Sequence, residues 1–329
     1  MSYLKTIRHA ERYLGLSKSP PFFESWYYKI VDAAGENPFA VIPAIFKSEA
    51  PEESYACIQI IDGLNSKTAF NKYLMEGLKA EERRFALNIG SNHFSETRLA
   101  LNIKSRDFGI NGTLVLGEMT PWPISLFSPN MNGLAGFLPN RRFNRKILSL
   151  NHDLIGHLNF NGRKIDFSGG KGFIEKNWGQ TSPTGRLWFQ SNHFSAYGTS
   201  LVGSLFVETN TNQETSRFSV GLRHKGFLHR FASHSRARTE AISLTEDSVE
   251  WVISSGKKTL EISADRQNEA VVFGGTEEGF TNRSKQTMLS EIRVTLKENQ
   301  TTILKDSGRF AAIELFGPID RLIETQQSS

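Results

Sequence analysis

The sequence has only one cysteine, Cys57, among its 329 residues, so it cannot form an intrachain disulfide. This cysteine lies in the apolar run 55–61, where a buried and unreactive thiol is expected. The lack of a disulfide framework is typical of a reducing compartment. The sequence also lacks a signal-peptide pattern and any apolar stretch long enough to span a bilayer. We therefore expect a cytoplasmic protein, with peripheral membrane contact as an open alternative.

Motifs for nucleotide, hydrolase and metal chemistry are also missing. No GxGxxG or GxxxxGK[ST] loop occurs, which disfavours nucleotide-dependent chemistry, and no GxSxG elbow supports hydrolysis. His152 and His157 are five residues apart, and so are His224, His229 and His234, so neighbours in each set face opposite sides of a strand. Since metal ligands must converge on one point, the sequence predicts no metal and no cofactor.

The charge balance is mildly basic, with 39 Lys and Arg against 34 Asp and Glu. Basic residues gather at 141–146 and 223–238, and such clusters can meet nucleic acid or an anionic membrane. A solvated strand face is the simpler interpretation. No zinc-finger, RNA-binding or helix-turn-helix pattern accompanies the clusters, so we expect no nucleic-acid partner.

What the sequence does contain is phenylalanine, at 24 positions, within a chain that is 38% hydrophobic and 22% charged. These proportions are those of a globular protein. Phenylalanine fits half-buried pleated surfaces and lines apolar cavities. The composition favours a β-rich protein with an apolar interior.

The pattern along the chain predicts an all-β fold. Short apolar or alternating runs are separated by turn residues on both sides of a polar Pro/Gly-bearing connection at 180–185. Residues 2–15 carry apolar residues at helical spacing before Pro20 and Pro21. We predict two antiparallel β-barrel or sandwich domains with a short N-terminal helix. The predicted divisions are 1–20 for the N-terminal extension, 21–182 for the first domain and 183–329 for the second.

Several local segments give sharper expectations. Asn161-Gly162 predicts a two-residue type I′ hairpin. The irregular stretch 119–143 is a candidate cover for the mouth of a cavity. Residues 91–95 repeat the sequence SNHFS of 191–195, which either marks a domain duplication or arises by chance. Residues 309–325 suggest a closing helix.

Three segments, in order along the chain, carry a family resemblance. They are 22–28 (FFESWYY), 169–179 (GGKGFIEKNWG) and 187–194 (LWFQSNHF). The pattern of a Gly-rich strand, then Glu-Lys-Asn-Trp-Gly, then Trp-x-Gln-x-Asn is long and specific. It resembles the tocopherol cyclase-like family, over most of residues 20–315. The resemblance implies two lipocalin-like β-domains.

The resemblance also implies a chemistry, the closing of a chromanol ring on a prenylated hydroquinone. A proton adds to the prenyl double bond and leaves a tertiary cation, which the phenolic oxygen then attacks. Such a reaction needs a buried acid, aromatic shielding of the cation and an apolar slot for the tail. The expected ligand is therefore an apolar prenylquinone or another isoprenoid or lipid.

Glu24 and Glu175 are the candidate acids, because each lies close in sequence to a tryptophan. A carboxyl group in a poorly hydrated aromatic pocket has a raised pKa and can donate a proton near neutral pH. The structural alternative is a buried ion pair of Glu175 with Lys176 or Arg186.

The candidate binding residues are aromatic and polar. Trp26, Tyr27, Trp178 and Trp188 could form an aromatic wall, and the alternative for each ring is ordinary core packing. Trp188, Gln190 and Asn192 share one face of a regular strand, where the two amides would be polar handles. His193 lies in the same family-like segment.

Two functions from different classes follow. One is a cyclase of the tocopherol cyclase type, an isomerase. The other is a non-catalytic lipocalin-like carrier of an isoprenoid or lipid, which would use the same cavity without an acid.

Overall fold

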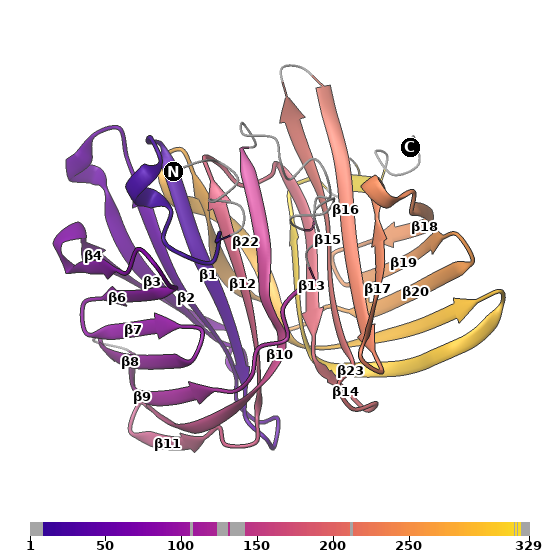
Figure 1. Cartoon of the computed structure of the whole chain (residues 1–329), viewed down its shortest axis with the longest axis horizontal. Helices are drawn as coiled ribbons and strands as arrows, with labels where there is room; N and C mark the ends of the chain where they lie inside the picture. The colour runs from indigo at the N-terminus through magenta and orange to yellow at the C-terminus, as the bar shows by residue number, and fades with distance from the viewer. Residues whose placement is uncertain are drawn as a thin grey trace. The chain divides into compact units, whose positions relative to one another are not determined.

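The computed structural model describes residues 9–105, 108–123, 131, 142–210, 213–318, 320 and 322–323, and these residues form an all-β protein. The predicted all-β class is confirmed. The strands belong to two antiparallel sheets (Figure 1). The 3-10 helices in the described part of the chain are η1 (Gly15–Ser17), η2 (Pro51–Glu53), η3 (Met75–Gly77) and η5 (Ser233–Ser235).

The first sheet has twelve strands, in the order β4-β3-β2-β1-β12-β10-β9-β8-β7-β6-β5, with β11 paired to β10. Their bounds are β1 Phe22–Val31, β2 Pro38–Lys47, β3 Tyr55–Asp62, β4 Lys67–Leu74, β5 Leu78–Ala80, β6 Ala86–Ile89, β7 Asn92–Ser95, β8 Arg98–Lys104, β9 Gly109–Leu116, β10 Phe143–Phe160, β11 Arg163–Asp166 and β12 Lys171–Gly179.

The second sheet has eleven strands, in the order β17-β16-β15-β13-β23-β22-β20-β19-β18, with β14 paired to β23 and β21 to β22. Their bounds are β13 Gly185–Ser191, β14 His193–Phe194, β15 Ser200–Asn210, β16 Gln213–His224, β17 Phe227–Ala232, β18 Arg238–Leu244, β19 Ser248–Ser255, β20 Lys258–Asp265, β21 Ala270–Thr276, β22 Gly279–Glu298 and β23 Thr301–Phe316.

Both sheets follow the same topology. In each, the first strand pairs with the last, β1 with β12 and β13 with β23. The two edge strands of each sheet are also consecutive in sequence, β4 with β5 and β17 with β18. Each sheet therefore curls back on itself as a barrel (Figure 1). The SNHFS repeat is not a trace of this likeness, because 91–95 lies at β7, within the path of the first sheet, whereas 191–195 runs from the end of β13 through β14, which pairs only with β23.

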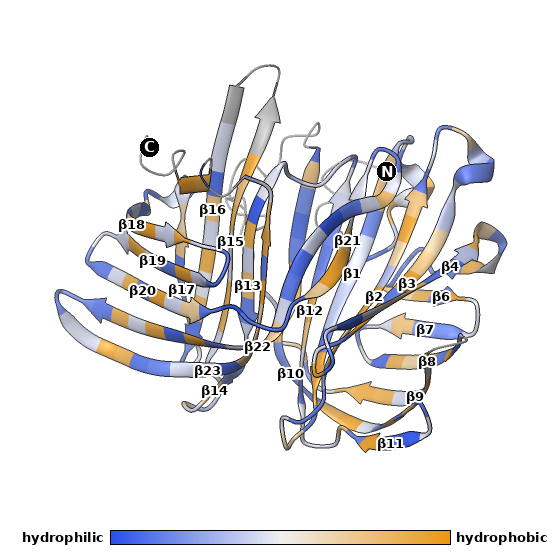
Figure 2. Ribbon diagram, turned by 180° about the vertical axis from the view of Figure 1, so that it is seen from behind, coloured by the Kyte–Doolittle hydropathy of each residue, from blue (hydrophilic) through white to orange (hydrophobic). Residues whose placement is uncertain are grey.

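Apolar and polar residues alternate along the strands, and this alternation gives both barrels an apolar interior (Figure 2). Along β8, for example, buried residues alternate with exposed or partly exposed ones, as in an antiparallel strand with one core face. The strands β1 to β3 differ, because they are buried on both faces. Their inward face joins the main core of the first unit, around Trp26, Tyr28 and Ile30.

The chain divides into two compact units, Met1–Ser182 with Val272–Asn282, and Pro183–Val271 with Arg283–Ser329. The predicted division after residue 182 places 272–282 in the second domain. Its hairpin belongs to the first unit because it covers the outer face of β3. The Gln59 side-chain amide there bonds both backbone groups of Phe273, at 2.8 and 2.9 Å. Tyr55 accepts a hydrogen bond from the Phe280 N–H at 2.9 Å.

Two local predictions need correction and one is confirmed. The short N-terminal helix occurs as the 3-10 helix η1 and not over 9–14, and residues 1–8 lie outside the described residues. The predicted closing helix at 309–325 is wrong up to Phe316, because β23 continues its pairing with β22 there. The Asn161-Gly162 hairpin is confirmed, since both residues have positive φ between β10 and β11.

The irregular stretch 119–143 is described only in part. The described residues at the start of this stretch lie beside β10, where the Leu150 N–H donates to the Thr120 carbonyl at 2.6 Å. Most of the predicted cavity cover lies outside the described residues.

We predict that Gln59 holds the 272–282 hairpin on the first unit. The Gln59→Leu variant keeps the volume and leaves both backbone groups of Phe273 without the amide. The free energy of unfolding should fall by about 1–3 kcal/mol for each buried group left unpaired. Urea unfolding measures this loss, and hydrogen exchange should quicken at the Phe273 amide. The matched control is Asn71→Leu, since Asn71 makes a single 3.4 Å bond on the next strand. Equal stability of the two variants would contradict the role of Gln59.

Candidate functional site

The family-like segments of the first unit are neighbouring strands. In the register of β1 and β12, Glu24 lies opposite Trp178 and Trp26 lies opposite Lys176. Because opposed residues share a face, these four side chains point to the same side, which is the core side of Trp26. The next residue on each strand points the other way, so Glu175 and Tyr27 lie together on the outer face.

Glu24 is a fully buried carboxylate with every approach occupied by a donor. The Lys176 ammonium lies 2.5 Å from Oε2, and both side chains are 0% exposed. The Gly15 N–H donates to Oε1 at 2.8 Å, and the Leu14 N–H donates at 3.1 Å. The Glu24 carboxylate is therefore engaged both in a buried ion pair and in hydrogen bonds to the backbone of residues 14 and 15.

Lys176 completes this cluster from the other strand. Its ammonium also donates to the Arg12 carbonyl and lies over the rings of Trp26 and Trp178, 4.4 and 5.5 Å from their centroids. Burial lowers the pKa of Lys176, while the Glu24 carboxylate opposes that shift. The aromatic wall predicted for a substrate cation thus already holds a cation of the chain itself.

The N-terminal segment is tied down by the same cluster. The indole N–H of Trp26 donates to the Glu11 carbonyl at 2.9 Å. The Glu11 carboxylate in turn pairs with Lys146 at 2.7 Å. Burial and the Glu24 charge raise the pKa of Tyr13 above its usual value. Residues 11–15 therefore close over the ion pair and exclude water from it.

Glu175 forms a second buried ion pair on the outer face. Arg145 of β10 grips it with two hydrogen bonds, Nη2 to Oε2 at 2.7 Å and Nε to Oε1 at 3.1 Å. The exposed fractions are 2% for Arg145 and 1% for Glu175. Lys176, one of the two predicted partners, points to the opposite face of β12. The other, Arg186, lies 3.7 Å from Glu314.

Lys29 and Tyr27 share this outer face. Tyr27 lies directly opposite Glu175, and Lys29 lies one pair further along, opposite Phe173. Lys29 is 1% exposed, and burial lowers the pKa of its ammonium to about 7. A lysine that titrates near neutral pH is a feature that the sequence analysis missed, because only the burial of both faces of β1 produces it.

The remaining predicted residues lie in the second unit. Trp188 and Gln190 are buried on the same face of β13, and Asn192 follows the end of that strand. The guanidinium of Arg186 lies 5.7 Å from the Trp188 ring. His193 opens β14 and meets the Phe310 ring edge-on at 5.2 Å. The predicted set therefore falls into three groups, namely Glu24 with Trp26 and Trp178, Glu175 with Tyr27, and the residues of 188–193.

His152 is a further polar group in the first unit. It is buried to 2% exposure on β10, opposite Gly172. Burial lowers its pKa to about 4, so the imidazole is neutral at pH 7. From its sequence spacing, His152 is considered only as a metal ligand. The signal that could have marked it is Gly172, a glycine placed where a large buried ring needs space.

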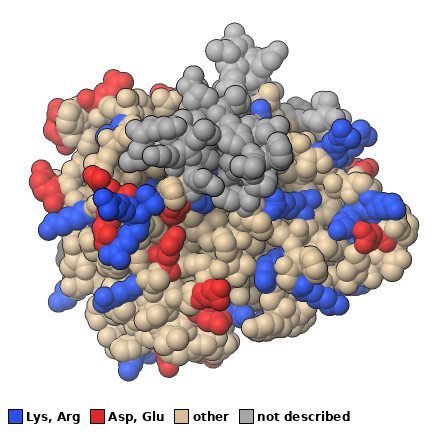
Figure 3. Space-filling model, in the orientation of Figure 1, with Lys and Arg blue, Asp and Glu red and all other residues tan. Residues whose placement is uncertain are grey.

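The described basic residues of the cluster at 141–146 are paired with acids. Arg142 pairs with Glu277, Arg145 with Glu175, and Lys146 with Glu11. On the face drawn in Figure 3, basic side chains are interspersed with acidic ones. This cluster is therefore not a uniform basic patch.

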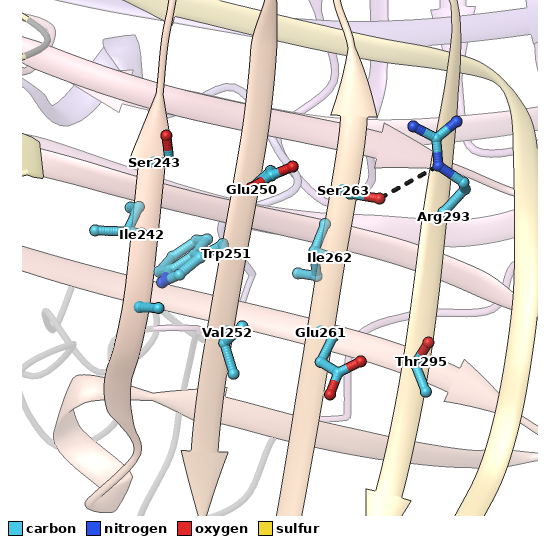
Figure 4. Close-up of a pocket in the computed structure, with 11 residues that line it drawn as sticks. Ile242, Ser243, Glu250, Trp251, Val252, Glu261, Ile262, Ser263, Arg293 and Thr295 are labelled. Carbon is cyan, nitrogen blue, oxygen red and sulfur yellow. Dashed lines mark hydrogen bonds between the residues drawn. The ribbon is translucent and has the colours of Figure 1, made fainter.

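A shallow pocket of about 360 Å³ lies on the second unit, across β18, β19, β20 and β22 (Figure 4). Glu250, Glu261 and Arg293 line it, and Arg293 bonds Ser263 at 3.3 Å. It contains none of the residues predicted from the sequence. An open depression with charged walls is also a poor match for an apolar ligand.

No group of three metal-ligating side chains occurs in the described part of the chain. Within the same residues, no helix is long and apolar enough to cross a membrane.

Comparison with known families gives one match. Residues 146–317 match the model of the tocopherol cyclase-like family, which is the family that the sequence motifs predicted. No curated protein matches the chain.

Two solved structures share the fold. One is a protein of Nitrosomonas europaea assigned as AttH, with 14% identity and a TM-score of 0.54, covering 90% of this chain and 92% of that one. The other is CghA solved with Sch210972, with 12% identity and a TM-score of 0.58, covering 91% of this chain and 89% of that one. These likenesses support the lipocalin-like fold.

We predict that Glu24 and Lys176 stabilise the fold as a pair. Glu24→Gln leaves the ammonium buried without a counter-charge and should lower the free energy of unfolding by about 3–5 kcal/mol. Adding Lys176→Met should restore much of that loss, because the uncompensated charge is gone. Denaturant unfolding of both single variants and the double variant forms the cycle. Additive losses would show that the two side chains do not interact.

We also predict a contribution of His152 to the pH dependence of stability. Its folded pKa, about 4, lies below the usual value of 6.5, so only the unfolded chain takes up the proton between these values. This contribution is therefore complete above pH 6.5 and is lost as the pH falls to 4, by at most about 3 kcal/mol. The measurement is the difference in unfolding free energy between parent and His152→Asn across pH 4–7. The exposed His157→Asn is the control, and a difference independent of pH would contradict the prediction.

Proposed function

The chain belongs to the tocopherol cyclase-like family, and we propose that it binds an apolar prenylated or isoprenoid ligand as a lipocalin-like carrier. The observation that favours a carrier over a cyclase is that both candidate acids already have buried hydrogen-bond and ion-pair partners. Glu24 accepts from Lys176 and two backbone N–H groups, and Glu175 accepts from both arms of Arg145. A carboxylate held in this way has to give up these partners before it can carry the proton that ring closure requires.

The interior of the first unit supports an apolar ligand. Trp26 stacks on Phe85 with centroids 5.4 Å apart, and Tyr28 and Phe94 continue the aromatic surface. Aliphatic side chains of β8, β9 and β10 complete the same cluster. A cavity opened among these core residues, with few polar groups, would suit an isoprenoid tail. The structure of CghA with Sch210972 supports ligand binding on this fold.

Cyclisation is the second candidate, and Glu175 is its better acid. Its carboxylate lies opposite Tyr27, whose ring meets Phe173 edge-on at 6.4 Å. In this reaction a proton adds to the prenyl double bond, the phenolic oxygen attacks the resulting cation, and the phenolic proton leaves. The Arg145 pair would have to open for Glu175 to take up that proton.

The test begins with binding. We expect a geranylated hydroquinone to quench tryptophan fluorescence and to raise the melting temperature at saturation, because a ligand that binds only the folded state stabilises it. Native mass spectrometry of the purified protein should detect a bound apolar molecule. Absence of quenching, of stabilisation and of any such molecule would overturn the proposal.

Turnover of the same compound then separates carrier from cyclase. The carrier yields no cyclised product. A cyclase that uses Glu175 should lose about 10²–10⁴-fold in rate on Glu175→Gln while still folding and binding. If Glu175 is structural, the same variant leaves Arg145 buried and uncompensated and loses about 3–5 kcal/mol of stability. Glu314→Gln, at the longer Arg186 contact, is the matched control.

A further inference from the structure

His152 faces the core of the first unit. It lies opposite Gly172 on β12, and Gly172 lies opposite Ile30 on β1. Opposed residues share a face of the sheet, and Ile30 belongs to the main core cluster. Leu154, two residues along from His152, belongs to the same cluster. The imidazole is therefore a polar ring in an apolar interior.

The hydrogen bonds of Ser149 fix the tautomer of this ring. The Ser149 hydroxyl donates its proton to the Asn151 carbonyl at 3.0 Å and accepts from the Thr120 N–H at 3.2 Å. Nδ1 of His152 lies 2.9 Å from the same oxygen. Since the hydroxyl proton is already used, Nδ1 carries a hydrogen and donates it. Nε2 is left with a bare lone pair.

That lone pair has no partner. Nε2 is buried and makes no hydrogen bond to any of the described residues. Protonation does not solve the problem, because burial lowers the pKa of the ring to about 4. An unpaired buried acceptor costs free energy, and buried polar atoms are normally satisfied by protein, water or ligand.

Gly172 makes this arrangement possible. A Cβ added there would lie 2.2 Å from Nε2 and 2.7 Å from Cε1. Real Cβ atoms do not approach so closely, so any other residue would displace the ring. Because Gly172 of the GGKGF segment has no side chain, the His152 ring can lie against it with Nε2 on the core face.

We propose that Nε2 of His152 accepts a hydrogen bond from a hydroxyl group of the ligand. This inference rests on the proposed binding function and assigns a residue that selects, among prenylated ligands, those with a free hydroxyl. A lone pair selects donors, so the site favours a hydroquinone O–H over an ether or a quinone carbonyl, which can only accept. The apolar surroundings raise that preference, because an unmatched acceptor gains nothing from water there.

The experiment compares geranylhydroquinone with its dimethyl ether by tryptophan fluorescence titration of the full chain. The parent should bind the hydroquinone at least about 10-fold more tightly than the ether. His152→Asn keeps an amide near the position of Nδ1 but removes Nε2, so this preference should disappear. His152→Gln returns a polar group near the position of Nε2 and should restore part of it. The exposed His157→Asn should behave like the parent.

Equal affinity of the parent for both compounds, or a preference unchanged in His152→Asn, overturns the inference and leaves the binding function standing. Failure to bind either compound overturns the binding function itself.

A second measurement covers variants that do not fold. In the parent, the ¹⁵N resonance of His152 Nε2 should move upfield when the hydroquinone binds and should not move with the ether. A resonance that both compounds leave unchanged would show that a buried water, and not the ligand, satisfies Nε2, and would overturn the inference.

Discussion

The buried pair of Glu24 and Lys176 is the constraint on which the first unit depends. Two opposite charges without exposure are tolerated only where each remaining lone pair or proton also finds a partner. The partners come from the backbone of 12–15 and from two indole rings. The first strand, the last strand and the N-terminal segment must therefore all be in place together. This requirement joins β1 and β12, which are the first and last strands of this sheet along the chain.

The same physics explains the most specific motif of the chain. Glu175 and Lys176 are adjacent, and adjacent side chains on a strand point to opposite faces. They cannot pair with each other, so each finds an opposite charge on a neighbouring strand, Arg145 of β10 and Glu24 of β1. An ion pair on each face of β12 fixes its neighbours on both sides. The Glu-Lys-Asn-Trp-Gly motif can thus be understood as architecture before any chemistry is invoked.

The sequence correctly predicted the structural features that are determined by residues close together in the chain. The alternation of apolar residues predicted the all-β class, and Asn161-Gly162 predicted its hairpin, because both depend on a few adjacent residues. The pairing of Glu175 with Arg145 was not predicted, because the two residues are 30 positions apart in the chain and lie on different strands. The membership of 272–282 in the first unit depends on contacts with Gln59 and Tyr55, which cannot be recognised before β3 is placed. The unpaired Nε2 of His152 likewise emerges only when Ser149 and Gly172 are seen around it.

The surroundings of the buried ionisable side chains bear on whether a protein of this fold can act as an acid catalyst. An acid must gain and lose a proton, and its surroundings must tolerate both states. Glu24 is surrounded by donors that all favour the anion, and the cation site on Trp26 and Trp178 is filled by Lys176. Lys29 and His152 differ, since burial favours their neutral forms and leaves them able to accept. His152 on the core face and Lys29 on the outer face of the first unit are therefore able to receive a hydrogen bond, whereas Glu24 and Glu175 are each held in a buried ion pair.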